Sequence, residues 1–120
     1  ELMARGILEI QKAGIAPDIW KLEGMEKPED VSRVVEACRA NGTNAGIIVL
    51  GRGEDSEKVK AWLRAGANIS GVIGFAIGRT VFWNSIVKYY KGEITAEVAS
   101  QEIASTYKMF VDLWYEARNK

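Results

Sequence analysis

A lysine and a glutamate two residues apart, Lys21 and Glu23, form the first pair of side chains that could do chemistry together. They stand in a short apolar run, Ile19 to Glu23, which is typical of a β-strand, so both side chains point to the same face. A lysine in a dry interior holds its proton weakly and becomes an amine nucleophile toward carbonyl groups. The alternative is a structural Lys21–Glu23 ion pair at a solvated strand end, and the spacing alone leaves both interpretations open.

Two glycine–arginine sequences, each placed after an apolar run and before a helical pattern, predict an anion site. Glycine lets the backbone approach a ligand closely, and the first N–H groups of the following helix attract negative charge. Arginine adds a permanent, fork-shaped cation. The alternative is that the glycines only permit tight turns and that the arginines pair with nearby acids. The residues that we expect to bind a substrate phosphate are Gly51, Arg52, Gly53, Gly78, Arg79 and Thr80.

These residues must be positioned by strands that alternate with helices. The predicted strands are 19–23, 45–50 and 72–77, and the predicted helices are 2–13, 28–41, 56–66, 81–91 and 96–119. Strands that alternate with helices form right-handed βαβ units and a parallel sheet. Ligand sites in such sheets lie beyond the carboxyl ends of the strands, where the lysine and both glycine–arginine sequences stand.

Aromatic side chains are expected to pack helices against strands rather than to stack on a ligand, and a helical stripe such as Met109, Phe110, Leu113 and Trp114 is usually core. The residues interpreted in this way are Trp20, Phe75, Phe82, Trp83, Tyr89, Tyr90 and Trp114. The chain has one cysteine, Cys38, which excludes a disulfide framework. Cys38 stands in a helical pattern, which favours the role of a small buried apolar group.

Composition excludes several classes of function. The chain has 120 residues, and 16 basic side chains balance 16 acidic ones, so neither nucleic acid nor an anionic membrane is expected as a partner. Histidine is absent, which removes Ser-His-Asp and Cys-His catalysis and metal sites built on imidazole. We therefore expect no metal and no cofactor. The single cysteine fits a reducing cytoplasm. The sequence predicts one unit, residues 1–120, that opens as if already inside a helix, as a piece of a longer protein would.

The three strand ends, residues 18–23, 46–53 and 71–83, resemble the last three strands of class I aldolase barrels. The resemblance is to tagatose-bisphosphate aldolases and to the aldolase-like domain fused to bacterial 5-dehydro-2-deoxygluconokinase in myo-inositol catabolism. It implies that Lys21 forms a Schiff base with a substrate ketone and that both glycine–arginine loops hold a phosphate. The Gly51–Gly53 loop departs from the Ser/Gly-rich loop of the sugar-bisphosphate enzymes.

The fold expected on this basis is α/β: the C-terminal half of a (β/α)8 barrel with three parallel strands. The resemblance implies a lyase that cleaves a phosphorylated keto-sugar or keto-sugar acid, with Glu23 either assisting proton transfer or holding Lys21. The first five strands of such a barrel are missing, so this chain alone is expected to be inactive. The alternatives are a non-catalytic phosphosugar-binding or regulatory domain attached to a sugar kinase, and a purely structural half-barrel. Open sheet edges predict association with the missing N-terminal half or with a second copy.

Overall fold

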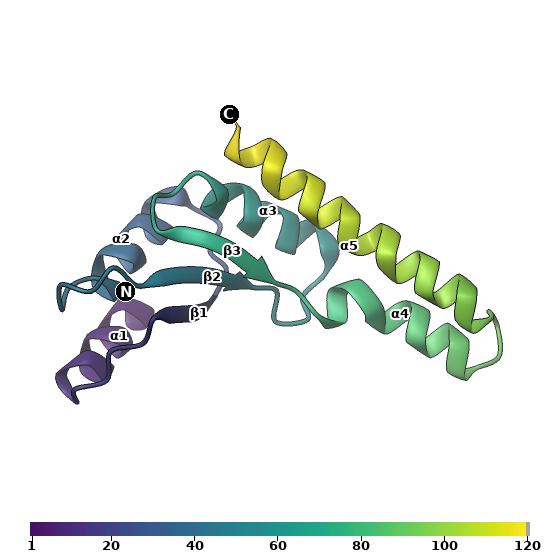
Figure 1. Ribbon diagram of the computed structural model, residues 1–120, viewed down its shortest axis with the longest axis horizontal. Coiled ribbons are helices and arrows are strands. Elements are labelled where there is room, and N and C mark those ends of the chain that lie inside the picture. The colour runs from purple at the N-terminus through teal and green to yellow at the C-terminus, as the bar shows by residue number, and fades with distance from the viewer. Residues whose placement is uncertain (120) are drawn as a thin grey trace.

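The structure, a computed structural model, describes residues 1–119 and is an α/β fold with a parallel sheet (Figure 1). In chain order its elements are α1 (Leu2–Lys12), β1 (Ile19–Glu23), α2 (Pro28–Cys38), β2 (Gly46–Leu50), α3 (Ser56–Ala67), β3 (Val72–Ala76), α4 (Arg79–Tyr90) and α5 (Ala96–Arg118). The strands lie in the order β1-β2-β3, and both pairs are parallel. The predicted alternation of strands and helices and the parallel sheet are therefore confirmed.

Helix starts follow the capping residues in the sequence. The carboxylate of Asp55 accepts hydrogen bonds of 3.0 Å from the N–H groups of both Glu57 and Lys58, which fixes the start of α3. The hydroxyl of Thr95 accepts one from the N–H of Val98 at 3.3 Å and begins α5. By contrast, α4 begins at Arg79, two residues earlier than the sequence pattern predicts, and its cap residue, Gly78, offers no side-chain hydrogen bond.

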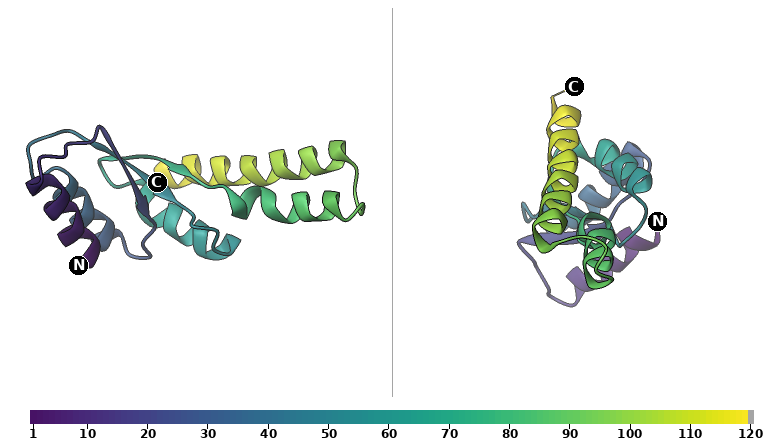
Figure 2. Two further views of the ribbon diagram at one scale, coloured as in Figure 1. Left: turned by 90° about the horizontal axis from the view of Figure 1, so that it is seen from below. Right: turned by 90° about the vertical axis from the view of Figure 1, so that its right-hand side faces the viewer.

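Helices α1, α2 and α3 cover one face of the sheet and leave the other open (Figure 2, left). Alternate strand residues divide between the two faces, as a pleated strand requires. On the covered face, Trp20, Ile47 and Val72 are buried. On the open face, Ile19 and Ile73 are each 52% exposed. Parallel sheets are usually covered on both faces, so this open apolar face is unusual.

A β-bulge between Ile47 and Ile48 lets Ile73 stand as an extra residue in β3. The side chain of Ile73 lies across Gly46 in the neighbouring strand. A Cβ atom at Gly46 would come within 2.5 Å of the Ile73 Cδ1 atom. A side chain at position 46 would therefore displace the end of the exposed Ile73 side chain.

The last two helices form an arm that extends beyond the sheet (Figure 1). The carboxyl-terminal part of α5 returns to the core, where the rings of Phe75 and Trp114 lie 5.6 Å apart. The radius of gyration is 16.5 Å, and the principal extents are 51 × 33 × 21 Å. A compact domain of this length has a radius of gyration of about 14 Å, so the described chain is elongated.

Candidate functional site

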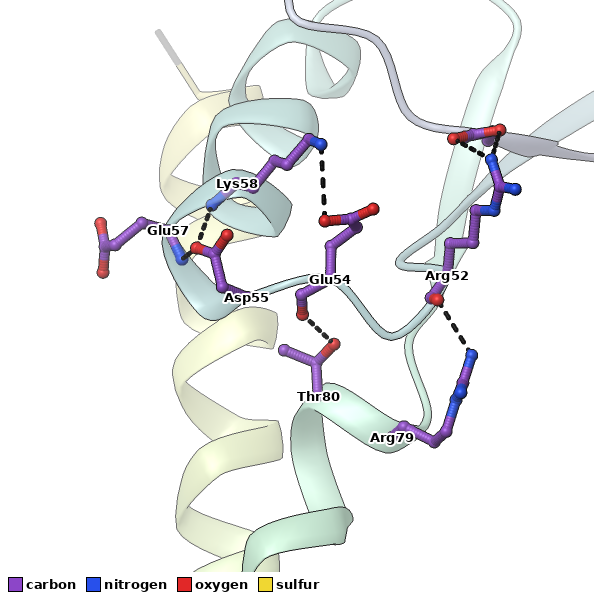
Figure 3. A network of polar contacts seen from close by, with 8 residues as sticks. Arg52, Glu54, Asp55, Glu57, Lys58, Arg79 and Thr80 are labelled. Carbon is purple, nitrogen blue, oxygen red and sulfur yellow. Dashed lines mark hydrogen bonds and ion pairs between the residues drawn. The ribbon is translucent and has the colours of Figure 1, made fainter.

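The two glycine–arginine loops meet at the carboxyl edge of the sheet, as the sequence analysis predicts for parallel strands. The guanidinium Nη2 of Arg79, at the start of α4, donates to the carbonyl oxygen of Arg52 at 3.0 Å. The hydroxyl of Thr80 donates to the carbonyl oxygen of Glu54 at 2.8 Å. Figure 3 shows both contacts, which join the β2–α3 loop to the first turn of α4.

The β2–α3 loop has an unusual backbone at this junction. Arg52 and Gly53 both have positive φ angles, +55° and +78°. The guanidinium of Arg79 packs flat against Gly53, because a Cβ atom there would lie 2.8 Å from the Arg79 Cζ and Nη2 atoms. Glycine at 53 thus supplies both the left-handed turn and the room for the arginine. Gly51, by contrast, is buried. A Cβ atom there would lie 3.4 Å from the side chains of Ile77, in the β3–α4 loop, and Val59, in α3.

A cavity of about 550 Å³ opens beside this junction. Its lining includes Gly53, Glu54, Asp55, Arg79, Thr80 and Trp83. Three of the six residues predicted to hold a phosphate therefore line one cavity. Trp83 stands one helical turn after Arg79, and that spacing is the signal that could have placed it here.

The acids in the cavity wall have partners of their own. Asp55 is the cap of α3, so the N-terminus of that helix is already occupied by a carboxylate. The carboxylate of Glu54 pairs with the ammonium group of Lys58 at 3.4 Å. The N-terminus of α4 has no such carboxylate, since its cap is Gly78. Of the two helix starts that line the cavity, those of α3 and α4, α4 is the one that can receive an external anion.

Arg52 does not extend into this cavity; it pairs with the carboxylate at the end of β1. Its Nη1 atom donates to both carboxylate oxygens of Glu23, at 2.7 and 2.8 Å. Hydrogen bonding to Glu23 is the largest cause of a raised pKa for Arg52, and the negative charge of Glu23 is the second. The pair joins β1 to the β2–α3 loop and engages Glu23 with an arginine.

Lys21 lies on the open face of the sheet, opposite Ile48 in β2, and its side chain is exposed. Among the described residues its ammonium group has no hydrogen-bond partner, and Glu23 pairs with Arg52 instead. The Lys21–Glu23 ion pair considered from the spacing is thus not formed. The dry environment that would activate an amine is also not present around Lys21 in this chain alone.

Within residues 1–119, no cluster of three or more metal-ligating side chains is found. The helices described in the same range are all too short or too polar to cross a membrane. Cys38 is fully buried, and burial raises the pKa of its thiol from 9.0 to about 11. Its expected role as a small buried group fits this environment.

Comparison with known proteins corrects the resemblance described above. No curated protein and no solved structure matches the chain. One family model matches residues 1–118, nearly the whole chain, and it is not an aldolase family. Assignment to the class I aldolases, including the domain linked to 5-dehydro-2-deoxygluconokinase, is therefore wrong; short apolar strands that end in glycine recur in many α/β proteins. The chain belongs to the family described as an uncharacterized protein conserved in bacteria, DUF2090.

Proposed function

We propose that this chain is a binding unit for a small phosphorylated molecule, of the size of a sugar phosphate, at the carboxyl edge of its sheet. The observation that carries the proposal is the position of Arg79. Its guanidinium is fixed by Gly53 and by the carbonyl of Arg52, and it lies in the wall of a cavity at an uncapped helix start. A fixed arginine beside free helix N–H groups is suited to a phosphate dianion.

Donor capacity at the site supports an anionic ligand. A guanidinium carries five N–H donors, and within the described residues the side chain of Arg79 uses one of them, toward Arg52. The remaining donors match the fork geometry of a phosphate group. The first N–H groups of α4 add the positive end of the helix dipole.

The size and the walls of the cavity support a ligand that is larger than a free anion. Pockets for small molecules are typically about 300–1,000 Å³, and this one, at about 550 Å³, lies within that range. Trp83 contributes an apolar wall one turn from the arginine, against which the carbon skeleton of a sugar can pack. The hydroxyl groups of such a ligand would find acceptors in the carboxylates of Glu54 and Asp55.

Binding without catalysis is favoured over a Schiff-base lyase for this chain by the state of Lys21 and Glu23. The lysine is exposed and the glutamate is held by Arg52, so neither is placed for imine chemistry. Cleavage of a keto-sugar by Lys21 stays a prediction. It would require that further chain cover the open face of the sheet, and borohydride trapping of an imine on Lys21 would test it.

We also propose a finer fold assignment, in which the three strands are part of a (β/α)8 barrel. Successive strands are neighbours in the sheet, and all three preceding helices lie on one face (Figure 2). In a closed barrel the open apolar face, with Ile19 and Ile73, becomes the interior. The cavity at the carboxyl edge then lies where barrels bind phosphate.

Tryptophan fluorescence provides the test, because Trp83 is 55% exposed whereas the other three tryptophans are at most 8% exposed. We expect fructose 6-phosphate to change the emission in a saturable manner and unphosphorylated fructose to have no effect. Arg79→Gln should abolish the change. Arg33→Gln is the matched control, since Arg33 is an exposed arginine on α2 outside the cavity. Equal responses from wild type and Arg79→Gln, or no response from wild type, would refute the site.

A further inference from the structure

Helix α4 turns its more polar side inward, toward α5. Val81, Ser85 and Lys88 recur at positions i, i+4 and i+7 and lie on the side that contacts α5. There the hydroxyl of Ser85 donates to a carboxylate oxygen of Glu102 at 2.8 Å, and the ammonium of Lys88 donates to the same carboxylate at 3.2 and 3.3 Å. The hydrogen bond from Ser85 is the largest cause of a lowered pKa for Glu102, and the hydrogen bond from Lys88 is the second. A polar cluster therefore occupies part of the α4–α5 contact.

The opposite side of α4 is aromatic and open to solvent. Trp83 and Tyr90, seven residues apart and therefore on one side of the helix, are 55% and 82% exposed. Phe82 and Tyr89 border them at 37% and 44%. These four residues form what we call the α4 aromatic face. They were expected to pack in the core, and this is wrong because α5 covers only the other side of the helix.

The apolar side of a helix is normally buried against another element. Each large aromatic side chain buries about 150–250 Å² when it is covered, so exposure of four of them on one helix side calls for a partner surface. We propose that the α4 aromatic face binds a second copy of this chain, helix against helix across a two-fold axis.

The charges on this helix permit self-association. Helix α4 has two charged residues: Arg79 stands at its first position, where its guanidinium donates to the carbonyl oxygen of Arg52, and Lys88 is engaged with Glu102 on the other side. The four residues of the α4 aromatic face carry no charge of their own and Arg79 lies at the end of the helix, so two copies of this face can meet across a two-fold axis. The chain as a whole has no net charge that would keep copies apart.

The exposed area points to the same conclusion. The chain exposes 7539 Å², whereas a compact monomer of its mass, 13.3 kDa, exposes about 6,450 Å². The excess is about 1,100 Å², and a stable two-protein interface buries about 800 Å² on each partner. The excess is shared with the open face of the sheet, so a test must distinguish these two surfaces.

Light scattering after gel filtration, at protein concentrations up to about 1 mM, provides this test, since association depends on concentration. We expect wild type to be a dimer and Tyr90→Glu to be monomeric, with the dissociation constant of the dimer raised about 30-fold or more. Tyr90 does not line the phosphate cavity, and its exposure means that this variant should fold normally, which circular dichroism checks. Tyr115→Glu is the matched control, because Tyr115 is 61% exposed on α5.

Ile73→Lys tests the competing surface, the open face of the sheet. A dimer that survives Ile73→Lys and Tyr115→Glu but not Tyr90→Glu supports the proposal. A wild-type monomer at every concentration would overturn it, as would a dimer that only Ile73→Lys dissociates.

Disulfide trapping gives a second, independent readout. Cys38 is fully buried, so Tyr90→Cys would carry a single accessible thiol. With dissolved oxygen and a copper catalyst as the oxidant, which takes up the two electrons and two protons of the thiols, this variant should form a disulfide-linked dimer, whereas Tyr115→Cys should not. Equal cross-linking of both variants would contradict the α4 interface. Trp83 lines the cavity and also belongs to the α4 aromatic face, so the two proposals share this residue. Arg79→Gln tests ligand binding and Tyr90→Glu tests association, so a failure of one proposal can be told apart from a failure of the other.

Discussion

Replacing Gly53 with alanine tests whether the position of Arg79 determines anion binding. The φ angle of Gly53 is +78°, and alanine in a left-handed conformation costs about 1–2 kcal/mol. The added Cβ would also lie 2.8 Å from the Arg79 guanidinium. Because ordinary contacts begin near 3.4 Å, the guanidinium must move by about 0.6 Å or more, and its hydrogen bond to Arg52 weakens.

Gly42→Ala is a matched control for the backbone strain. Gly42 has nearly the same φ angle, +81°, but nothing lies within 4 Å of its Cβ position. It precedes β2 and is therefore at the opposite edge of the sheet from Arg79. We expect urea denaturation to show a similar loss of about 1–2 kcal/mol in both variants.

The two variants should differ in ligand binding. A charge-assisted hydrogen bond contributes about 1.5–3 kcal/mol, so displacing Arg79 should weaken binding of fructose 6-phosphate about tenfold or more. Gly42→Ala should bind as wild type does. Isothermal titration calorimetry measures both affinities. Unchanged affinity in a folded Gly53→Ala variant would refute the inference that Arg79 must be held against Gly53.

Three further predictions concern stability and thiol reactivity. Gly24→Ala should destabilise the fold by about 1–3 kcal/mol or more, because a Cβ there would lie 2.4 Å from the buried ring of Trp62; urea denaturation measures the loss, and a neutral result would contradict the packing. Asp55→Ala should cost about 1 kcal/mol through loss of the α3 cap, whereas Asp55→Asn should retain most of it. Cys38 ionises near pH 9 when unfolded and near 11 when folded, so its contribution to stability is complete below pH 9 and is lost as pH rises through 11. In the native state it should resist thiol reagents at neutral pH, and rapid labelling without denaturant would contradict its burial.

Much of the fold could be predicted from local sequence patterns. The apolar runs that became β1, β2 and β3 are short and end in glycine, and the helices carry their own caps, such as Asp55 and Thr95. The meeting of the two glycine–arginine loops followed from parallel topology. These features depend on residues close together in the chain or on rules that all parallel sheets obey.

Other features depend on contacts that the sequence does not specify. Arg52 pairs with Glu23, 29 residues away, because the register of β1 and β2 brings the ends of both strands together. The sequence shows that α4 is rich in aromatic residues, but it does not show that α5 covers only one side of this helix. For the same reason Trp83 was interpreted as a core residue, although it is exposed and lines the cavity.

The central claim is that a phosphorylated ligand binds at Arg79, and amide chemical-shift mapping tests it most directly. Fructose 6-phosphate should shift the backbone amide signals of Gly53, Arg79 and Thr80 and the indole signal of Trp83. The signals of Lys21 and of the open sheet face should stay in place. Shifts confined to the open face, or no saturable shift at Arg79, would contradict the account.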